Sequence, residues 1–321
     1  MSTRPTGPTV RTSLTVAHHE LRMMVRERLI IVVLAVFLSM TVLAGYIGYS
    51  SALVVDQAYA LALPYLQRVG PVRANPFDAV SHLSLQRNLS IYYFLIGSLL
   101  AIIIGYVAGV RDRTARTSGL LLSRPVSRTA YTRAKVLTVL AALALVLALS
   151  FTVTMAASAF LPGLSLSIDQ AGRLVLFFTL SWVYLGVFGL LGLAAGIGAR
   201  TEISALLLPV VTWIVVGFVL PQASSATEPT ATLNPVTVSA PISSPNQYFV
   251  VMGQLTSPLS IADAYKRTAN DLLEFATRAP VGQVLADNTS HLGAVAGALL
   301  IALTMATIAI RRYSPTEDGI S

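Results

Sequence analysis

Six long stretches without Asp, Glu, Lys or Arg constrain what this chain can fold into. They cover residues 29–50, 89–110, 136–161, 174–199, 204–220 and 291–310. A helix that crosses the hydrocarbon core of a bilayer needs about 20 apolar residues, with about 17 as the lower limit, so each stretch is long enough. The sequence therefore predicts an all-α polytopic membrane protein whose transmembrane domain, residues 29–310, contains six transmembrane helices.

The composition agrees with a membrane protein. Hydrophobic residues make up 55% of the chain and charged residues 11%, whereas soluble domains carry about 25% charged residues. The stretch 204–220 is the shortest and contains Pro209, which predicts a kinked span, because neighbouring helices can satisfy the backbone groups that proline frees. There is no cysteine, which excludes disulfides, thiolate metal ligands and thiol nucleophiles.

Lys and Arg divide unevenly between the two sides of the predicted bundle. With a cytoplasmic N-terminus, 15 of the 22 lie on the inner side and seven on the outer side. Because basic residues accumulate in cytoplasmic segments, both termini, the tails 1–28 and 311–321 and the loop 111–135 are predicted to be cytoplasmic. The loops 51–88 and 221–290 would then be extracytoplasmic, in a multi-pass protein of the plasma (inner) membrane.

Several function classes are disfavoured by what the sequence lacks. A P-loop needs a lysine that follows glycine, but the chain has only Lys135 and Lys266, and neither follows glycine. No hydrolase or metalloprotease motif occurs. The six stretches contain no Asp, Glu, Lys or Arg, whereas ion-coupled carriers usually bury such a residue in a span. We therefore expect no catalytic, cofactor or metal site and no nucleic-acid partner, and an ATP-driven process would need a separate ATPase chain.

The loop 111–135 carries the most specific pattern. An acidic residue is followed by a threonine, a leucine triplet, a Ser-x-Pro-x-Ser-Arg run and a lysine at the start of the next span. The residues concerned are Asp112, Arg116, Thr117, Gly119, Leu120, Leu121, Leu122, Ser123, Arg124, Pro125, Ser127, Arg128 and Lys135. This order resembles the ABC-2 type permease family of ABC transporters, with two departures: Arg116 and Ala134 stand where that family usually has glycine.

The resemblance implies that this loop contains a coupling helix that contacts the ATPase subunit. Apolar leucines could enter a groove while flanking arginines pair with acidic residues at its rim. The alternative is that these arginines only mark the cytoplasmic side and contact lipid phosphate. The resemblance also implies two ATPase subunits, which bind ATP and Mg²⁺, and a second permease copy or a sister permease.

The N-terminal segment has the pattern of an amphipathic helix at the membrane surface. Leu14, Ala17, Leu21 and Met24 recur at helical spacing, and His19, Arg22 and Arg26 fall on another face. ABC-2 permeases commonly begin with a Glu-Leu pair before a basic turn, which corresponds here to Glu20 and Leu21. The neighbouring His18 and His19 point about 100° apart on a helix, which disfavours joint metal binding.

Two further features concern packing and the outer side. Gly186, Gly189, Gly192 and Gly196 would let the fourth span approach a neighbouring helix closely. Within 221–290, residues 259–277 predict an amphipathic helix that covers the bundle or receives an extracytoplasmic partner. The ABC-2 resemblance places gate helices in this loop, and the stretch 257–265 resembles permeases that serve the copper sites of nitrous oxide reductase.

The sequence thus predicts the permease subunit of an ABC transporter, most simply an exporter. The alternative is a non-transporting membrane protein that anchors or regulates a cytoplasmic partner through its basic loop.

Overall fold

The structure is a computed structural model of the 321-residue chain, and it describes residues 9–26, 28–69, 81–114, 128–160, 166–224, 251, 255, 260–275 and 277–312. The regular elements in these ranges are helical. The first half contains α1 (Thr9–Arg26), α2 (Leu29–Val69), a 3₁₀ turn η1 (His82–Gln86), α3 (Arg87–Tyr92), a π-turn η2 (Tyr93–Gly97), α4 (Ser98–Thr114) and α6 (Arg128–Phe160). The second half contains α7 (Ile168–Gly198), α8 (Glu202–Ile214), a π-turn η3 (Val215–Val219), α9 (Leu220–Ser224), α12 (Ile261–Leu272), α13 (Val281–Asp287) and α14 (Thr289–Arg312).

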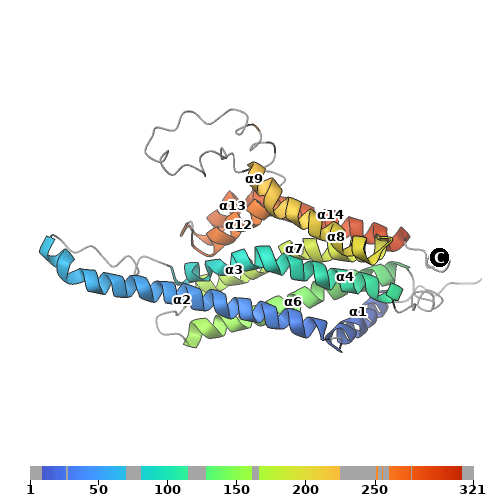
Figure 1. Ribbon diagram of the computed structural model, residues 1–321, viewed down its shortest axis with the longest axis horizontal. Coiled ribbons are helices and arrows are strands. Elements are labelled where there is room, and N and C mark those ends of the chain that lie inside the picture. Colours follow the sequence, from blue (N-terminus) through green and yellow to red (C-terminus); the bar gives the residue numbers. More distant parts are fainter. Residues whose placement is uncertain are drawn as a thin grey trace, which may run out of the picture.

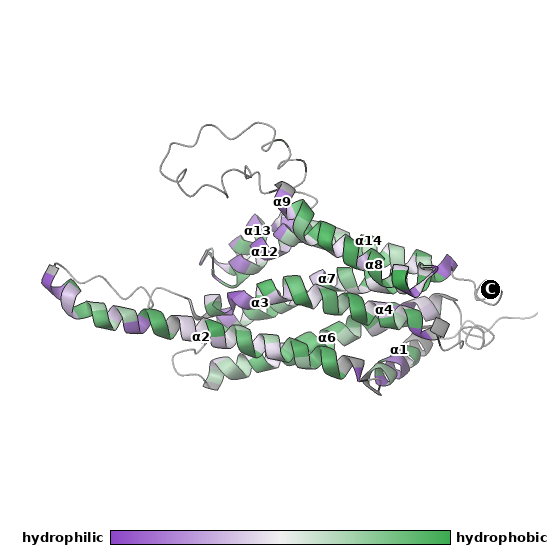
Figure 2. Cartoon of the chain, viewed as in Figure 1, coloured by the Kyte–Doolittle hydropathy of each residue, from purple (hydrophilic) through white to green (hydrophobic). Residues whose placement is uncertain are grey.

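Within the described ranges, six helical segments are long and apolar enough to cross a membrane, which confirms the predicted all-α architecture. They are Ile31–Arg68, Leu83–Arg111, Thr129–Ala159, Ile168–Gly198, Glu202–Gln222 and Thr289–Arg312. Figure 2 shows that hydrophobic residues dominate the long helices, whereas α12, α13 and the ends of the bundle carry more hydrophilic ones. The helix α1 and the last turn of α14 lie at one end of the bundle, and α12 and α13 lie toward the other (Figure 1).

Helix α7 forms the centre of the bundle. In its 18-residue apolar stretch, 67% of the residues are buried inside the structure. Glycines allow its backbone to touch that of α4. A Cβ atom on Gly105 of α4 would lie 1.8 Å from the carbonyl oxygen of Gly189, and one on Gly192 would lie 2.4 Å from that of Ile102. No side chain fits at such distances, so the glycines set the separation of α4 and α7. Gly186 and Gly196 lie on the same helix, against Leu299 and Tyr106.

The first span differs most from its expected length. Helix α2 continues to Val69, 19 residues beyond the expected end at residue 50, and projects past the bundle (Figure 1). At 1.5 Å per residue, its 41 residues reach about 60 Å, roughly twice the thickness of a hydrocarbon core. Residues 51–63 contain neither glycine nor proline, so no helix-breaking residue ends the helix where its first charge, Asp56, appears.

The fourth and fifth spans also differ from their predicted boundaries. Helix α7 begins at Ile168 rather than at residue 174, because the Ser167 hydroxyl and the Gln170 side chain form a capping box. Helix α8 runs through Pro209 without ending, and the helical chain continues through η3 to Ser224. Residues 313–321 of the expected tail 311–321, residues 225–250, 252–254, 256–259 and 276 of the loop 221–290, and residues 70–80 and 161–165 lie outside the described residues.

Candidate functional site

The two helices that border the expected coupling loop are described, and the centre of the loop is not. Helix α4 ends at Thr114 and α6 begins at Arg128, so Asp112 and Arg128 lie on helix ends, and their side chains are not described. The remaining expected residues of the loop, other than Lys135, lie outside the described residues: Arg116, Thr117, Gly119, Leu120, Leu121, Leu122, Ser123, Arg124, Pro125 and Ser127.

Lys135 lies at the centre of a buried polar junction that the sequence did not reveal as such. Its side chain is fully buried, and its ammonium nitrogen lies 3.0 Å from a carboxylate oxygen of Glu20, whose side chain is 14% exposed. The same nitrogen donates a hydrogen bond of 2.9 Å to the backbone carbonyl of Ala108, and it lies 5.5 Å from the ring centroid of Tyr131. One cation thus connects α1, α4 and α6.

Helix α1 packs against α6 through its apolar face. Ala17 and Met24 are buried, and Leu21 packs against the core from a partly buried position. Arg22 and the neighbouring His19 are exposed, as an amphipathic helix requires. The side chain of Arg26, which we also expected on the polar face, lies outside the described residues.

The junction places an ion pair in a low-dielectric environment. Two opposite charges stabilise each other there only when both remain, and removal of one partner costs about 3–5 kcal/mol. The carboxylate of Glu20 therefore fixes α1 against the start of α6, and the Ala108 carbonyl fixes the end of α4 to the same point. Helices α1, α4 and α6 are consequently held together at one lysine.

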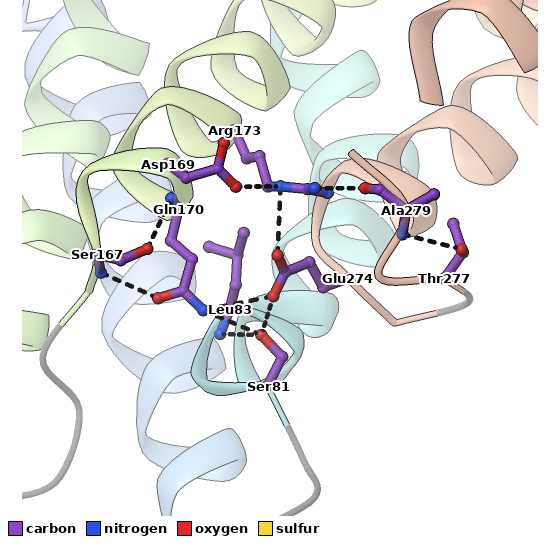
Figure 3. Close-up of polar contacts among 9 residues, drawn as sticks. All are labelled: Ser81, Leu83, Ser167, Asp169, Gln170, Arg173, Glu274, Thr277 and Ala279. Carbon is purple, nitrogen blue, oxygen red and sulfur yellow. Dashed lines mark hydrogen bonds and ion pairs between the residues drawn. The ribbon is translucent and has the colours of Figure 1, made fainter. Parts of the chain in front are cut away.

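A second polar cluster lies where α7 begins, around the buried side chain of Arg173 (Figure 3). Its Nε lies 3.0 Å from Asp169 Oδ2 and 3.2 Å from Glu274 Oε1, and Nη2 donates to the carbonyl of Ala279. Glu274 also accepts a hydrogen bond from Ser81 and one of 3.3 Å from the Gln170 side chain. The cluster therefore joins the first turns of α7 to the segment before η1 and to the chain after α12.

Helix α12 is held against the bundle on two sides. The Tyr265 ring stacks on that of Tyr184 at 4.2 Å between centroids, and the Tyr265 and Ser181 hydroxyl oxygens are 2.9 Å apart. Burial raises the pKa of the Tyr265 phenol well above its usual value, so the phenol remains protonated. Asn288 donates to Asp271 at 2.8 Å and accepts from Thr268, which connects α12 to the turn before α14.

Helices α12 and α13 lie in the chain between the fifth and sixth candidate spans, where the sequence suggested that helices occur. The expected helix at 259–277 is present as α12, although shorter, and it packs against the protein's own helices. Glu274 ends it with a left-handed φ of 54°, a conformation that non-glycine residues adopt rarely.

The sequence did not indicate the Arg173 cluster, because Arg173 lies one residue before the stretch 174–199 and therefore outside the predicted span. The Ser167-x-x-Gln170 spacing, a signature of a helix start, was the signal that could have placed Arg173 inside the helix. Among the described residues, no group of three His, Asp or Glu side chains could hold a metal ion. The described contacts of both clusters connect helices to one another and to the adjoining segments.

Comparison with known proteins finds a family match. A family model described as ABC-2 family transporter protein matches residues 14–314, which include α1 from Leu14 onward, all six candidate spans and the outer helices. No curated protein matches the chain.

Proposed function

Because the chain belongs to the ABC-2 family of transporter proteins, we propose that it forms the translocation path of an ATP-driven transporter and couples to a separate ATPase subunit. The family and the six apolar helices make it a multi-pass membrane protein. The coupling segment is residues 111–135, with Leu120 to Leu122 entering an apolar groove of the ATPase and the flanking arginines at its rim.

The observation that carries this proposal is the position of Lys135. A segment that transmits motion must be connected firmly to the helices on both sides of it. Lys135 is the last residue of the segment and lies on α6. It contacts the Ala108 carbonyl, which precedes the segment on α4, and its pair with Glu20 adds α1. Movement of the segment would therefore displace the ends of two spans together, along with α1.

The remaining parts of the transporter follow from the proposed role. Two ATPase subunits bind ATP and Mg²⁺, and two permease chains, identical or sister, form the path between them. Both termini and the segment 111–135 lie in the cytoplasm, which agrees with 15 of 22 basic residues on that side. Transport runs outward, and α12 with α13 covers the outer end of the path.

The proposal is tested by purifying the chain from its native membrane with an affinity tag and reconstituting it in lipid nanodiscs. We expect an ABC ATPase to copurify, and we expect ATP hydrolysis in the complex but none in the chain alone. Reconstituted vesicles should then show ATP-dependent transport of the substrate. Copurification of a cytoplasmic protein that hydrolyses no ATP would instead support the anchoring function.

A further inference from the structure

A recess of about 220 Å³ lies between α2, η1 and α6, and it shares no lining residue with either polar cluster. Liquid water takes about 30 Å³ per molecule, so the recess has room for about seven non-hydrogen atoms of that size. Its wall is mainly apolar, with polar side chains set into it. The polar groups belong to Thr41, Tyr46, Tyr49, Gln86, Thr154 and Ser158.

The carboxamide of Gln86 is the unusual group in this wall. The residue is only 7% exposed, and within the described part of the chain its amide has no hydrogen-bond partner. It faces α2 at Gly45, where a Cβ atom would lie 4.0 Å from its Oε1. The amide lines the recess, so a molecule bound there could supply a hydrogen-bond partner that the described protein does not.

Three of the hydroxyls around the recess restrict what can bind. Thr41, Thr154 and Ser158 are buried, and each donates its proton to a backbone carbonyl four residues earlier, at 2.8–2.9 Å. These oxygens can therefore only accept a hydrogen bond from a ligand. A suitable ligand brings its own donor, and the Gln86 amide can both donate to it and accept from it.

Charge restricts the ligand further. All the residues that line the recess are uncharged types, so an ionised group inside it would lack a counter-charge, which is strongly unfavourable. On the rim, Val42 and Tyr46 are 58% and 67% exposed on the outer surface of α2, where an acyl chain could lie.

We propose that this recess binds a neutral amphiphile through a free hydroxyl group, with Gln86 as the principal polar contact and the acyl chains along α2. The molecule is either a bilayer lipid or the transported compound, because both can present a neutral hydroxyl beside a hydrocarbon chain. The site does not depend on an ATPase partner, so a failure of binding would leave the proposed transport function standing.

The test uses the full chain in phosphatidylcholine nanodiscs and a 1,2-diacylglycerol with a photoactivatable diazirine near the head of one acyl chain. Two matched probes have the hydroxyl acetylated or replaced by a phosphate. We expect the diacylglycerol to label peptides from α2 and α6 at least about tenfold more efficiently than either matched probe. Equal labelling by the acetylated probe would overturn the proposal.

Variants locate the site. Gln86→Met removes no hydrogen bond from the described protein, so the fold should persist, and loss of one neutral hydrogen bond should weaken labelling about two- to tenfold. Ala157→Leu places a larger side chain in the recess and should abolish labelling. The matched control is Ala148→Leu, on the same helix but in a separate groove between α6 and α7. Unchanged labelling in Gln86→Met and Ala157→Leu would contradict the site.

The source of the amphiphile is identified by adding the copurified ATPase and ATP. Labelling that changes during hydrolysis identifies a transported compound, and labelling that stays constant identifies a resident lipid. Both results require that the diacylglycerol be captured at the recess in the first place. Labelling confined to the groove between α6 and α7 would refute the assignment in either case.

Discussion

The ion pair between Lys135 and Glu20 can be tested by a double-mutant cycle. Lys135→Met removes a fully buried ammonium group, and the Glu20 carboxylate loses this ion-pair partner. Removing one partner of a buried pair costs about 3–5 kcal/mol, whereas replacing both by hydrophobic residues of similar volume is often close to neutral. The double variant Glu20→Leu with Lys135→Met should therefore be more stable than either single variant.

Hydrogen–deuterium exchange of α1 measures this effect, because α1 is a terminal helix that can detach without global unfolding. A loss of 3–5 kcal/mol corresponds to amide exchange that is faster by about two to four orders of magnitude, up to the rate of an unprotected amide. The double variant should regain most of the protection. If the effects of the two substitutions simply add, or if Lys135→Met leaves exchange unchanged, the pair does not hold α1 in place.

Three further predictions concern the topology, the helix packing and the outer cluster. Cysteines introduced singly at residue 118 or 225 should react with an impermeant reagent in intact cells only in the Ser225→Cys variant, since 118 is expected in the cytoplasm. Gly105→Ala should separate α4 from α7 and destabilise the protein by about 1–3 kcal/mol or more, as measured by thermal unfolding. The control is Gly172→Ala, whose Cβ meets nothing within 4 Å, and it should leave the stability unchanged or raise it. Arg173→Met should speed hydrogen–deuterium exchange in α12 and α13 and leave exchange in α1 unaffected. If α12 and α13 are as well protected in the variant as in the unaltered protein, this side chain does not hold them in place.

The number and order of the spans could be predicted because charged residues are absent from six long stretches. Helix ends could not, because hydropathy reports where a helix can enter lipid and says little about where it stops. Asp56 ends the apolar stretch of α2, yet the helix continues for 13 more residues, through Pro64, to Val69. The Ser167 cap shows the opposite case, in which a local signal fixes the start of α7 before its apolar stretch begins.

The two sites differ in how far the sequence revealed them. Glu20 and Lys135 were both singled out, but they lie in different motifs, and their contact depends on the packing of α1 against α6. Arg173 and Glu274 are about a hundred residues apart in the chain and belong to no motif. Burial decides the importance of these charges, and burial is a property of the assembled bundle.

The coupling of residues 111–135 to an ATPase is tested most directly by measuring how tightly the ATPase subunit binds the Leu121→Asp, Leu122→Asp double variant. Two carboxylates in an apolar groove, at a penalty of roughly 4 kcal/mol, should weaken ATPase binding about a thousandfold. Arg116→Glu is the control and should weaken binding by less than about tenfold, because a rim charge is worth about 1 kcal/mol or less. If the double variant inserts and accumulates normally in the membrane but binds its ATPase as tightly as the unaltered protein, the segment is not the coupling element.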